Sequence, residues 1–156
     1  MKMKTFAIAI LGALTFALPL SFLAHCQIPC GIFDDGARFA LMLEHVDTIE
    51  KSMKQIEELG RAEKPNWNQI VRWVNNKEDH ADQLSEIATH YFMAQRVKPP
   101  KGADAAAQEK YVKEITLLHG IVVSAMKAKQ TTDLQHCANL RKNIEAFKKS
   151  YLTKPS

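Results

Sequence analysis

Two cysteines and a histidine lie close together near the start of the chain, in the segment His-Cys-Gln-Ile-Pro-Cys-Gly that begins at His25. Cys26 and Cys30 offer two thiolates, the form of cysteine that binds metals. In a chain that began at His25, the free α-amino group and the backbone nitrogen of Cys26 would add two nitrogen ligands. A planar set of two nitrogens and two sulfurs suits Ni(II) or Cu(II) rather than tetrahedral zinc. The His25 imidazole would be within reach of an axial position.

The residues around the second cysteine favour a closed turn. Pro29 restricts the backbone just before Cys30, and Gly31 allows the chain to leave the turn at an unusual dihedral angle. The two cysteines could instead form a Cys26–Cys30 disulfide, since disulfides persist in exported proteins. Zinc usually takes about four ligands, and only three side chains are available locally. The spacing therefore leaves a disulfide and a metal site as the two interpretations.

Residues 1–24 have the pattern of a removable leader. Two lysines in the first four residues precede an almost wholly apolar stretch from Phe6 to Leu23, and the small residue Ala24 follows. This order of a basic region, a hydrophobic region and a small residue is typical of a signal peptide. The alternative is a retained membrane anchor, which Gly12 and Pro19 disfavour. We expect cleavage after Ala24, a mature chain that starts at His25 without a membrane segment, and a periplasmic or secreted location.

The rest of the chain predicts four helices. Apolar residues recur at spacings of three and four, the period of one helix face, in each of four segments. The predicted helix starts are Asp34 or Asp35, Asn66, Asp104 and a capping box at Thr132–Gln135, and Pro99 with Pro100 ends the second helix. Short connections between amphipathic helices predict an all-α fold, an antiparallel four-helix bundle over residues 34–156 preceded by a metal-binding hook at residues 25–33. The apolar stripes run Phe39, Met42, Val46, Ile49, Met53 and Ile56; Trp67, Ile70, Val74, Ala81, Leu84, Ala88 and Tyr91; Tyr111, Ile115, Leu118, Val122 and Ala125; and Leu134, Cys137, Leu140, Ile144, Phe147 and Tyr151.

Composition excludes several classes of protein. The 156 residues are 46% hydrophobic and 24% charged, which is too polar for a multi-pass membrane protein. A net charge of +4 is small and scattered, so it gives no reason to expect nucleic-acid binding. Three cysteines are too few for a disulfide-built scaffold. Cys137 lies on the fourth apolar stripe, where we expect a buried thiol.

The segment that begins at His25 resembles the nickel hook of the nickel-containing superoxide dismutases. The pattern of that family is His-Cys-x-x-Pro-Cys-Gly-x-Tyr-Asp at the mature N-terminus, and this chain matches each fixed position except one, where Phe33 replaces the tyrosine. Residues 73–81, with the sequence Trp-Val-Asn-Asn-Lys-Glu-Asp-His-Ala, are also similar to the family, as are the later Tyr91-Phe92, Gln95-Arg96 and Lys98-Pro99-Pro100.

The resemblance implies an enzyme that disproportionates superoxide to dioxygen and hydrogen peroxide at a Ni(II)/Ni(III) centre. Its ligands would be the amine and imidazole of His25, the backbone nitrogen and thiolate of Cys26, and the thiolate of Cys30, with one nickel ion per subunit. The resemblance also implies a homohexamer in which each hook lies against neighbouring subunits, and a protease that removes the leader. Two alternatives are an exported helical bundle with a Cys26–Cys30 disulfide and a nickel- or copper-carrying protein.

Two further expectations concern the surroundings of the metal. Phe33 keeps the aromatic ring of the family tyrosine but lacks its hydroxyl, so we predict activity with altered sensitivity to anions or peroxide. An axial imidazole usually needs a partner that orients it. The candidates are Glu44 and, within the polar interruption of the second stripe, Glu78, Asp79 and His80; that interruption could equally be a solvated face or a subunit contact.

Overall fold

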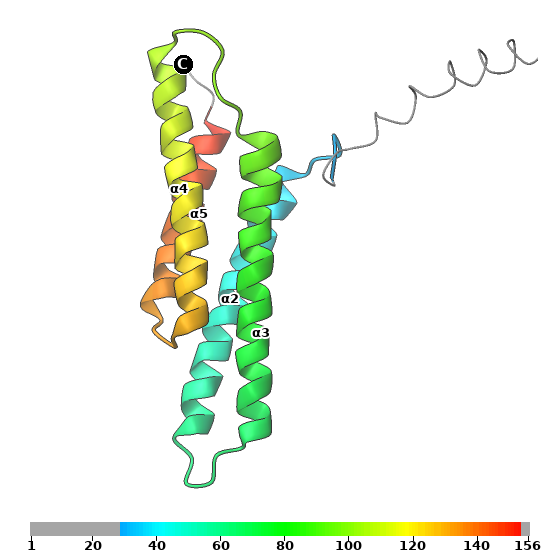
Figure 1. Cartoon of the computed structure of the whole chain (residues 1–156), viewed down its shortest axis with the longest axis vertical. Helices are drawn as coiled ribbons and strands as arrows, with labels where there is room; N and C mark the ends of the chain where they lie inside the picture. The colour runs from blue at the N-terminus through cyan, green and yellow to red at the C-terminus, as the bar shows by residue number, and fades with distance from the viewer. Residues whose placement is uncertain (1–28, 154–156) are drawn as a thin grey trace, which may run out of the picture. The chain divides into compact units, whose positions relative to one another are not determined.

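The computed structural model describes residues 29–153, which are mostly helical (Figure 1). The chain divides into two units, residues 1–31 and 32–156, and of the first unit only Pro29–Gly31 are described. The second unit contains α2 (Asp35–Gly60), α3 (Trp67–Glu86), η2 (Ile87–Arg96), α4 (Ala105–Gln130) and α5 (Gln135–Leu152). The leader, His25 and Cys26 lie outside the described residues.

The helices form an antiparallel bundle. Each of α2, α3 and α4 packs against the helix that follows it, and α5 packs back against α2 (Figure 1). Short connections force consecutive helices to run in opposite directions. The predicted all-α four-helix bundle is therefore confirmed, with α3 and η2 together forming the second helix.

Three of the four predicted helix starts are confirmed by their hydrogen bonds. The carboxylate of Asp34 accepts from the backbone N–H of Ala37 at 2.9 Å, and the Asn66 amide oxygen accepts from the N–H of Gln69 at 3.2 Å. Asp104 accepts from two backbone N–H groups at the start of α4. These contacts satisfy donors that have no partner inside the helix.

The predicted capping box at Thr132 is wrong. The helix begins at Gln135, and the Thr132 hydroxyl donates instead to the carboxylate of Glu57 on α2. Asp133 takes over part of the capping role, because its carboxylate accepts from the N–H of Gln135 at 2.9 Å. The Thr132 hydroxyl is thus bound to a charged acceptor on a neighbouring helix, and no side-chain hydrogen bond from Thr132 caps α5.

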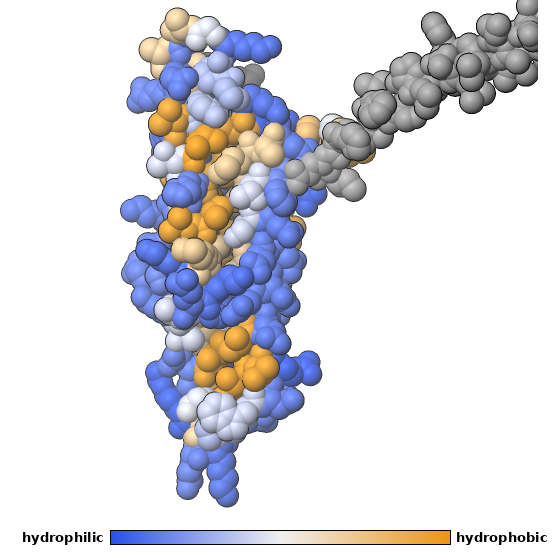
Figure 2. Space-filling view, in the orientation of Figure 1, coloured by the Kyte–Doolittle hydropathy of each residue, from blue (hydrophilic) through white to orange (hydrophobic). Residues whose placement is uncertain are grey.

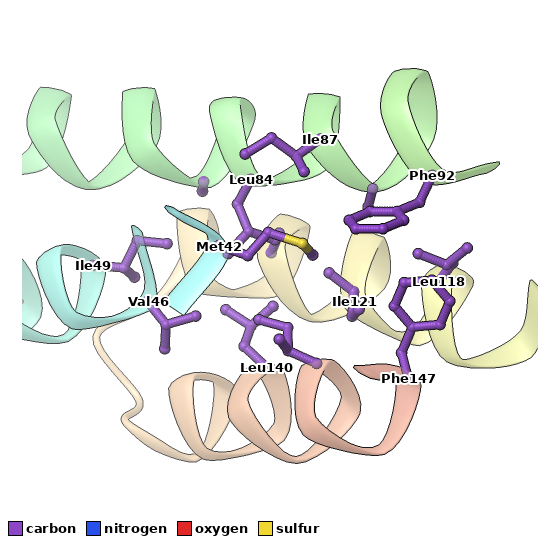
Figure 3. Packing of buried hydrophobic residues seen from close by; sticks show 14 of the residues in the cluster. Met42, Val46, Ile49, Leu84, Ile87, Phe92, Leu118, Ile121, Leu140 and Phe147 are labelled. Carbon is purple, nitrogen blue, oxygen red and sulfur yellow. The ribbon is translucent and has the colours of Figure 1, made fainter. Parts of the chain in front are cut away.

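The apolar stripes meet in one core. Most of their residues are buried, and Figure 3 shows side chains from all the helices pointing into the space between them. Trp67 and Leu134, the first residues of two stripes, are exposed because each stands at the very start of its helix. At one end the core becomes aromatic: the ring of Phe92 lies 4.7 Å from that of Phe39 and 5.0 Å from that of Phe147. Such contacts add to the stability gained from burial.

The last part of the second helix is not an α-helix. Residues Ile87–Arg96 form a π-helix, in which the Val97 N–H donates to the Phe92 carbonyl five residues earlier at 2.8 Å. Residues five apart point about 140° away from each other in an α-helix. In a π-helix they lie one turn apart on the same side. Tyr91 and Arg96 therefore share one face, which the sequence does not reveal.

Hydrophilic residues cover most of the face seen in Figure 2, with separate hydrophobic areas between them. The large apolar side chains that remain exposed come from several elements. Within residues 29–153, no helix combines the length and the apolar character that a membrane span requires. The exposed set is Ile32, Phe33, Trp67, Val71, Val112, Met126, Leu134 and Leu152.

Candidate functional site

The described part of the predicted hook is a turn at Pro29–Gly31. The Cys30 side chain is exposed, so its sulfur is accessible to a metal ion. Gly31 has a φ of 80°, a conformation that glycine adopts without the strain that a Cβ atom would cause. The prediction that Gly31 leaves the turn at an unusual dihedral is thus confirmed. His25 and Cys26, the other predicted ligands, lie outside the described residues.

A metal site elsewhere in the described part of the chain is not supported. Residues 29–153 contain no group of three or more histidine, cysteine, aspartate or glutamate side chains placed to hold a metal ion. Cys30 is the predicted side-chain ligand that lies among the described residues. In a chain that begins at His25, the predicted hook would offer amine, amide and thiolate donors, a set that fits nickel.

The bundle has a compact polar cluster at the start of α2, five residues after Cys30. It is centred on the Asp35 carboxylate, which accepts from Tyr91 Oη at 2.7 Å and Tyr151 Oη at 2.9 Å. Arg96 approaches the same carboxylate with two donors, Nε at 2.8 Å and Nη2 at 2.6 Å. This bidentate geometry is the strong form of an arginine–carboxylate pair. We call Asp35, Tyr91, Arg96 and Tyr151 the Asp35 cluster.

Electrostatics keep the Asp35 cluster in one protonation state at neutral pH. Burial alone would raise the pKa of Asp35, but the hydrogen bonds from Arg96, Tyr91 and Tyr151 and the charge of Arg96 outweigh it and lower that pKa. Burial and the bond to Asp35 raise the pKa of Tyr91 to about 12, and that of Tyr151 to about 12. Both hydroxyls therefore remain donors, and Asp35 remains their charged acceptor.

Phe33 joins this cluster through its ring. The Arg96 guanidinium carbon lies 4.4 Å from the centre of the Phe33 ring, within the range of a cation–π contact. The Tyr91 ring meets the same ring edge-on, with 5.7 Å between centres. Phe33 is still 36% exposed, so one part of the ring remains open to solvent. Phe33, the one departure from the predicted hook pattern, is thus a ring held by contacts with Arg96 and Tyr91.

The four predicted partners of the His25 imidazole lie further along the bundle. Glu44 and Asp79 are exposed and Glu78 is half-buried. His80 lies against His45 of α2, with 2.7 Å between the two Nδ1 atoms. Since His45 follows Asp35 by ten residues, it stands about 15 Å further along α2. The structure does not bring these four residues into the Asp35 cluster.

The polar interruption of the second stripe makes contacts between helices. Besides the His45–His80 pair, Asn76 donates to the Ser52 hydroxyl at 2.9 Å. Lys77 is buried, and its ammonium donates to the backbone carbonyls of Lys129 at 2.6 Å and Thr131 at 3.1 Å. A cation at the carbonyl end of α4 satisfies groups that have no partner within that helix. The interruption is therefore more than a solvated face.

Cys137 is the buried thiol that its place on the fourth stripe predicts. Its side chain is 2% exposed, and its sulfur lies 3.6 Å from that of Met53. Burial raises the pKa of Cys137 to about 11, so it is a thiol at neutral pH. It thus differs from Cys30 in exposure.

Sequence reasoning missed the cluster at the start of α2. The sequence places Asp35 only as an alternative helix cap and Tyr151 only in an apolar stripe. The available signal was the polar hydroxyl of two tyrosines within apolar stripes, because a buried tyrosine hydroxyl usually needs a partner. Which acceptor they share depends on the π-helix and on the pairing of α2 with α5.

Comparison with known proteins identifies a family. The family model described as nickel-containing superoxide dismutase matches residues 21–154, which include the predicted hook and all the helices. No curated protein and no solved structure matches the chain.

Proposed function

Because this chain belongs to the nickel-containing superoxide dismutase family, a family of oxidoreductases that act on superoxide, we propose that it binds one nickel ion per chain at its hook. The ligands are the amine and imidazole of His25, the backbone nitrogen and thiolate of Cys26, and the thiolate of Cys30. The observation that carries this proposal is the exposed Cys30 in a turn closed by Gly31 at φ 80°.

Each part of the hook has a distinct task. When bound, nickel would supply a one-electron couple that takes an electron from one superoxide ion and gives it to another. The anionic thiolates and the deprotonated amide are strong donors, which bring the oxidised state of the metal within reach. The Phe33 ring offers no hydroxyl to hold water or an anion. The hydroxyls of Tyr91 and Tyr151 donate to the Asp35 carboxylate.

The amine ligand makes leader removal part of the function. We infer cleavage between Ala24 and His25 by a leader-processing protease, because any extra residue would turn the amine into an amide and displace the imidazole. The hydrophobic leader with its basic start favours export to the periplasm or the exterior.

Assembly into a homohexamer is also part of the proposal. A short hook has little core of its own, so neighbouring subunits would supply the surface against which it is held. The partner of the His25 imidazole would then come from the exposed carboxylates Glu44 and Asp79 before the half-buried Glu78. His80 is a weaker candidate, because its Nδ1 already lies against His45.

Native mass spectrometry of the protein from its own host tests processing, metal and assembly together. The expected species is a hexamer of chains that start at His25, each with one nickel ion. A metal-free chain that is lighter by two hydrogen atoms would indicate a Cys26–Cys30 disulfide and would overturn the proposal.

A pair of cysteine variants then tests the ligand assignment and separates an enzyme from a metal carrier. We expect Cys30→Ser to lose nickel and superoxide turnover. Cys137→Ala, which removes a buried thiol from the core, should keep both. Nickel-dependent activity that survived in Cys30→Ser would contradict the assignment. Nickel binding without turnover in the unaltered protein would favour the carrier.

A further inference from the structure

The Asp35 cluster has no role in the proposed ligand set, yet it lies against Phe33, the residue that ends the hook. Two of its members contact the Phe33 ring: Arg96 from one face and Tyr91 from an edge. Both of these residues are themselves fixed by hydrogen bonds to the Asp35 carboxylate. The chain of contacts therefore runs from Asp35 through Arg96 and Tyr91 to Phe33.

Covalent geometry connects this ring to the metal ligands. Phe33 is three residues after Cys30, so a shift of its ring is passed along only two intervening residues, Gly31 and Ile32. Neither of these is buried, and Ile32 is 84% exposed. Within the described bundle, Phe33 is thus the first residue after the turn whose side chain is held by packing.

We propose that Asp35 is a positioning residue for the nickel site: it holds Arg96 and Tyr91 against the Phe33 ring and so fixes the end of the hook. This inference rests on the proposed function. Asp35 suits the task because its two oxygens accept four hydrogen bonds from two other elements, η2 and α5. Asparagine has the same shape but only one acceptor oxygen, and it brings donors that would face the donors of Arg96.

The test measures how fast nickel leaves the protein. Nickel-loaded protein is mixed with excess chelating dye, and the rate of nickel transfer is followed without any use of activity. We expect Asp35→Asn to speed nickel loss about tenfold, the lower end of the effect of removing a supporting contact in metal sites. The matched control is Asp104→Asn, which makes the same change of charge at the cap of another helix, α4. Asparagine caps helices as well as aspartate, so the control should retain the original rate.

A double variant shows whether Asp35 acts through Phe33. If it does, Asp35→Asn should change the rate by less than about twofold in a Phe33→Leu background, because the ring that it holds is already gone. A merely structural role would give the full tenfold effect again in that background, and this result would overturn the inference. An unchanged rate in the folded single variant Asp35→Asn would also overturn it.

A substitute variant and a separate check on the proposed function complete the test. If Asp35→Asn does not fold, Arg96→Lys takes its place, because lysine keeps the charge but loses the bidentate bond and the flat contact with the ring. Faster nickel loss in Arg96→Lys supports the inference, and the original rate contradicts it. Failure of the proposed function would be seen separately: the unaltered protein would hold no nickel, or Cys30→Ser would hold it equally well.

Discussion

Two polar regions of the bundle are built in opposite ways. The Asp35 cluster joins one carboxylate to a guanidinium and two hydroxyls, so each donor meets a charged acceptor. The middle region joins His45 to His80 and places the buried Lys77 on neutral carbonyls. We call this second set, His45, His80 and Lys77, the middle polar layer.

The two regions differ in how they respond to a change of pH. Opposite charges in the Asp35 cluster compensate each other, so its protonation state is fixed over a wide range of pH. In the middle polar layer, one of the two facing Nδ1 atoms must donate a hydrogen bond and the other must accept it. If both imidazoles were protonated, two cations would lie side by side. We infer that the Asp35 cluster provides a constant support for the hook, while the middle polar layer is the sensitive part of the bundle.

The largest effect on stability is expected from Lys77→Met. The substitution leaves the carbonyls of Lys129 and Thr131 without their donor, which costs about 2 kcal/mol when a hydrogen-bonding group is left unsatisfied. Urea unfolding followed by circular dichroism would measure this. Lys54→Met is the control, because Lys54 is exposed and makes only a surface pair with Glu50, worth less than about 1 kcal/mol. Equal losses in the two variants would mean that the carbonyl contact contributes nothing.

Acid should weaken the middle polar layer before the Asp35 cluster. Burial and the nearby His80 lower the pKa of His45 below its ordinary 6.5, although Glu44 opposes this. Because the pKa of His45 is lower in the folded protein, the folded state binds this proton less tightly than the unfolded state. Stability is therefore lost as the pH falls below about 6.5, by about 1.4 kcal/mol for each unit of the shift.

Unfolding at a series of pH values measures this loss. His45→Gln should flatten the decline between pH 6.5 and 5, whereas His119→Gln, which changes an exposed histidine, should not. The pKa of Asp35 is lowered from its ordinary 3.8, so the stability that this carboxylate contributes is lost only below about pH 3.8. If His45→Gln declined as steeply as the unaltered protein, the comparison between the two regions would fail.

A smaller effect is expected within the Asp35 cluster from Tyr151→Phe. The variant keeps the ring among the core aromatics and removes one of the four hydrogen bonds to Asp35, a loss of about 1.5 kcal/mol for a bond to a charged group. Tyr91→Phe should cost a similar amount. Tyr111→Phe, which alters a half-buried tyrosine outside the cluster, serves as the reference. Thermal unfolding of the three variants would rank them, and no difference between Tyr151→Phe and Tyr111→Phe would contradict the expectation.

The smallest effect on the fold is expected from Phe33→Tyr. The added hydroxyl lies on a ring that is already 36% exposed, so stability should change by less than about 0.5 kcal/mol. The inhibition of superoxide turnover by azide and by hydrogen peroxide should change, because the hydroxyl can hold water or an anion. Identical inhibition by both compounds would show that the missing hydroxyl of Phe33 has no functional consequence.

The fold could be predicted from the sequence because helix periodicity is a local signal. The stripe from Phe39 to Met53 is fully buried as its spacing predicts, and Asp34, Asn66 and Asp104 begin their helices. The capping box at Thr132 was wrong for a non-local reason, since its hydroxyl finds Glu57 on another helix. The π-helix also escaped prediction, because its apolar residues fit an α-helical stripe up to Tyr91.

The candidate site also has a part that the sequence predicts and a part that it does not. The sequence by itself predicts the nickel hook, because the proposed ligands His25, Cys26 and Cys30 are neighbours in the chain and their chemistry depends on type and spacing. Only the tertiary structure decided what supports the hook in the bundle. Asp35, Arg96 and Tyr151 are far apart in sequence, and they meet because a π-turn rotates Arg96 toward α2 and the bundle brings the end of α5 beside the start of α2.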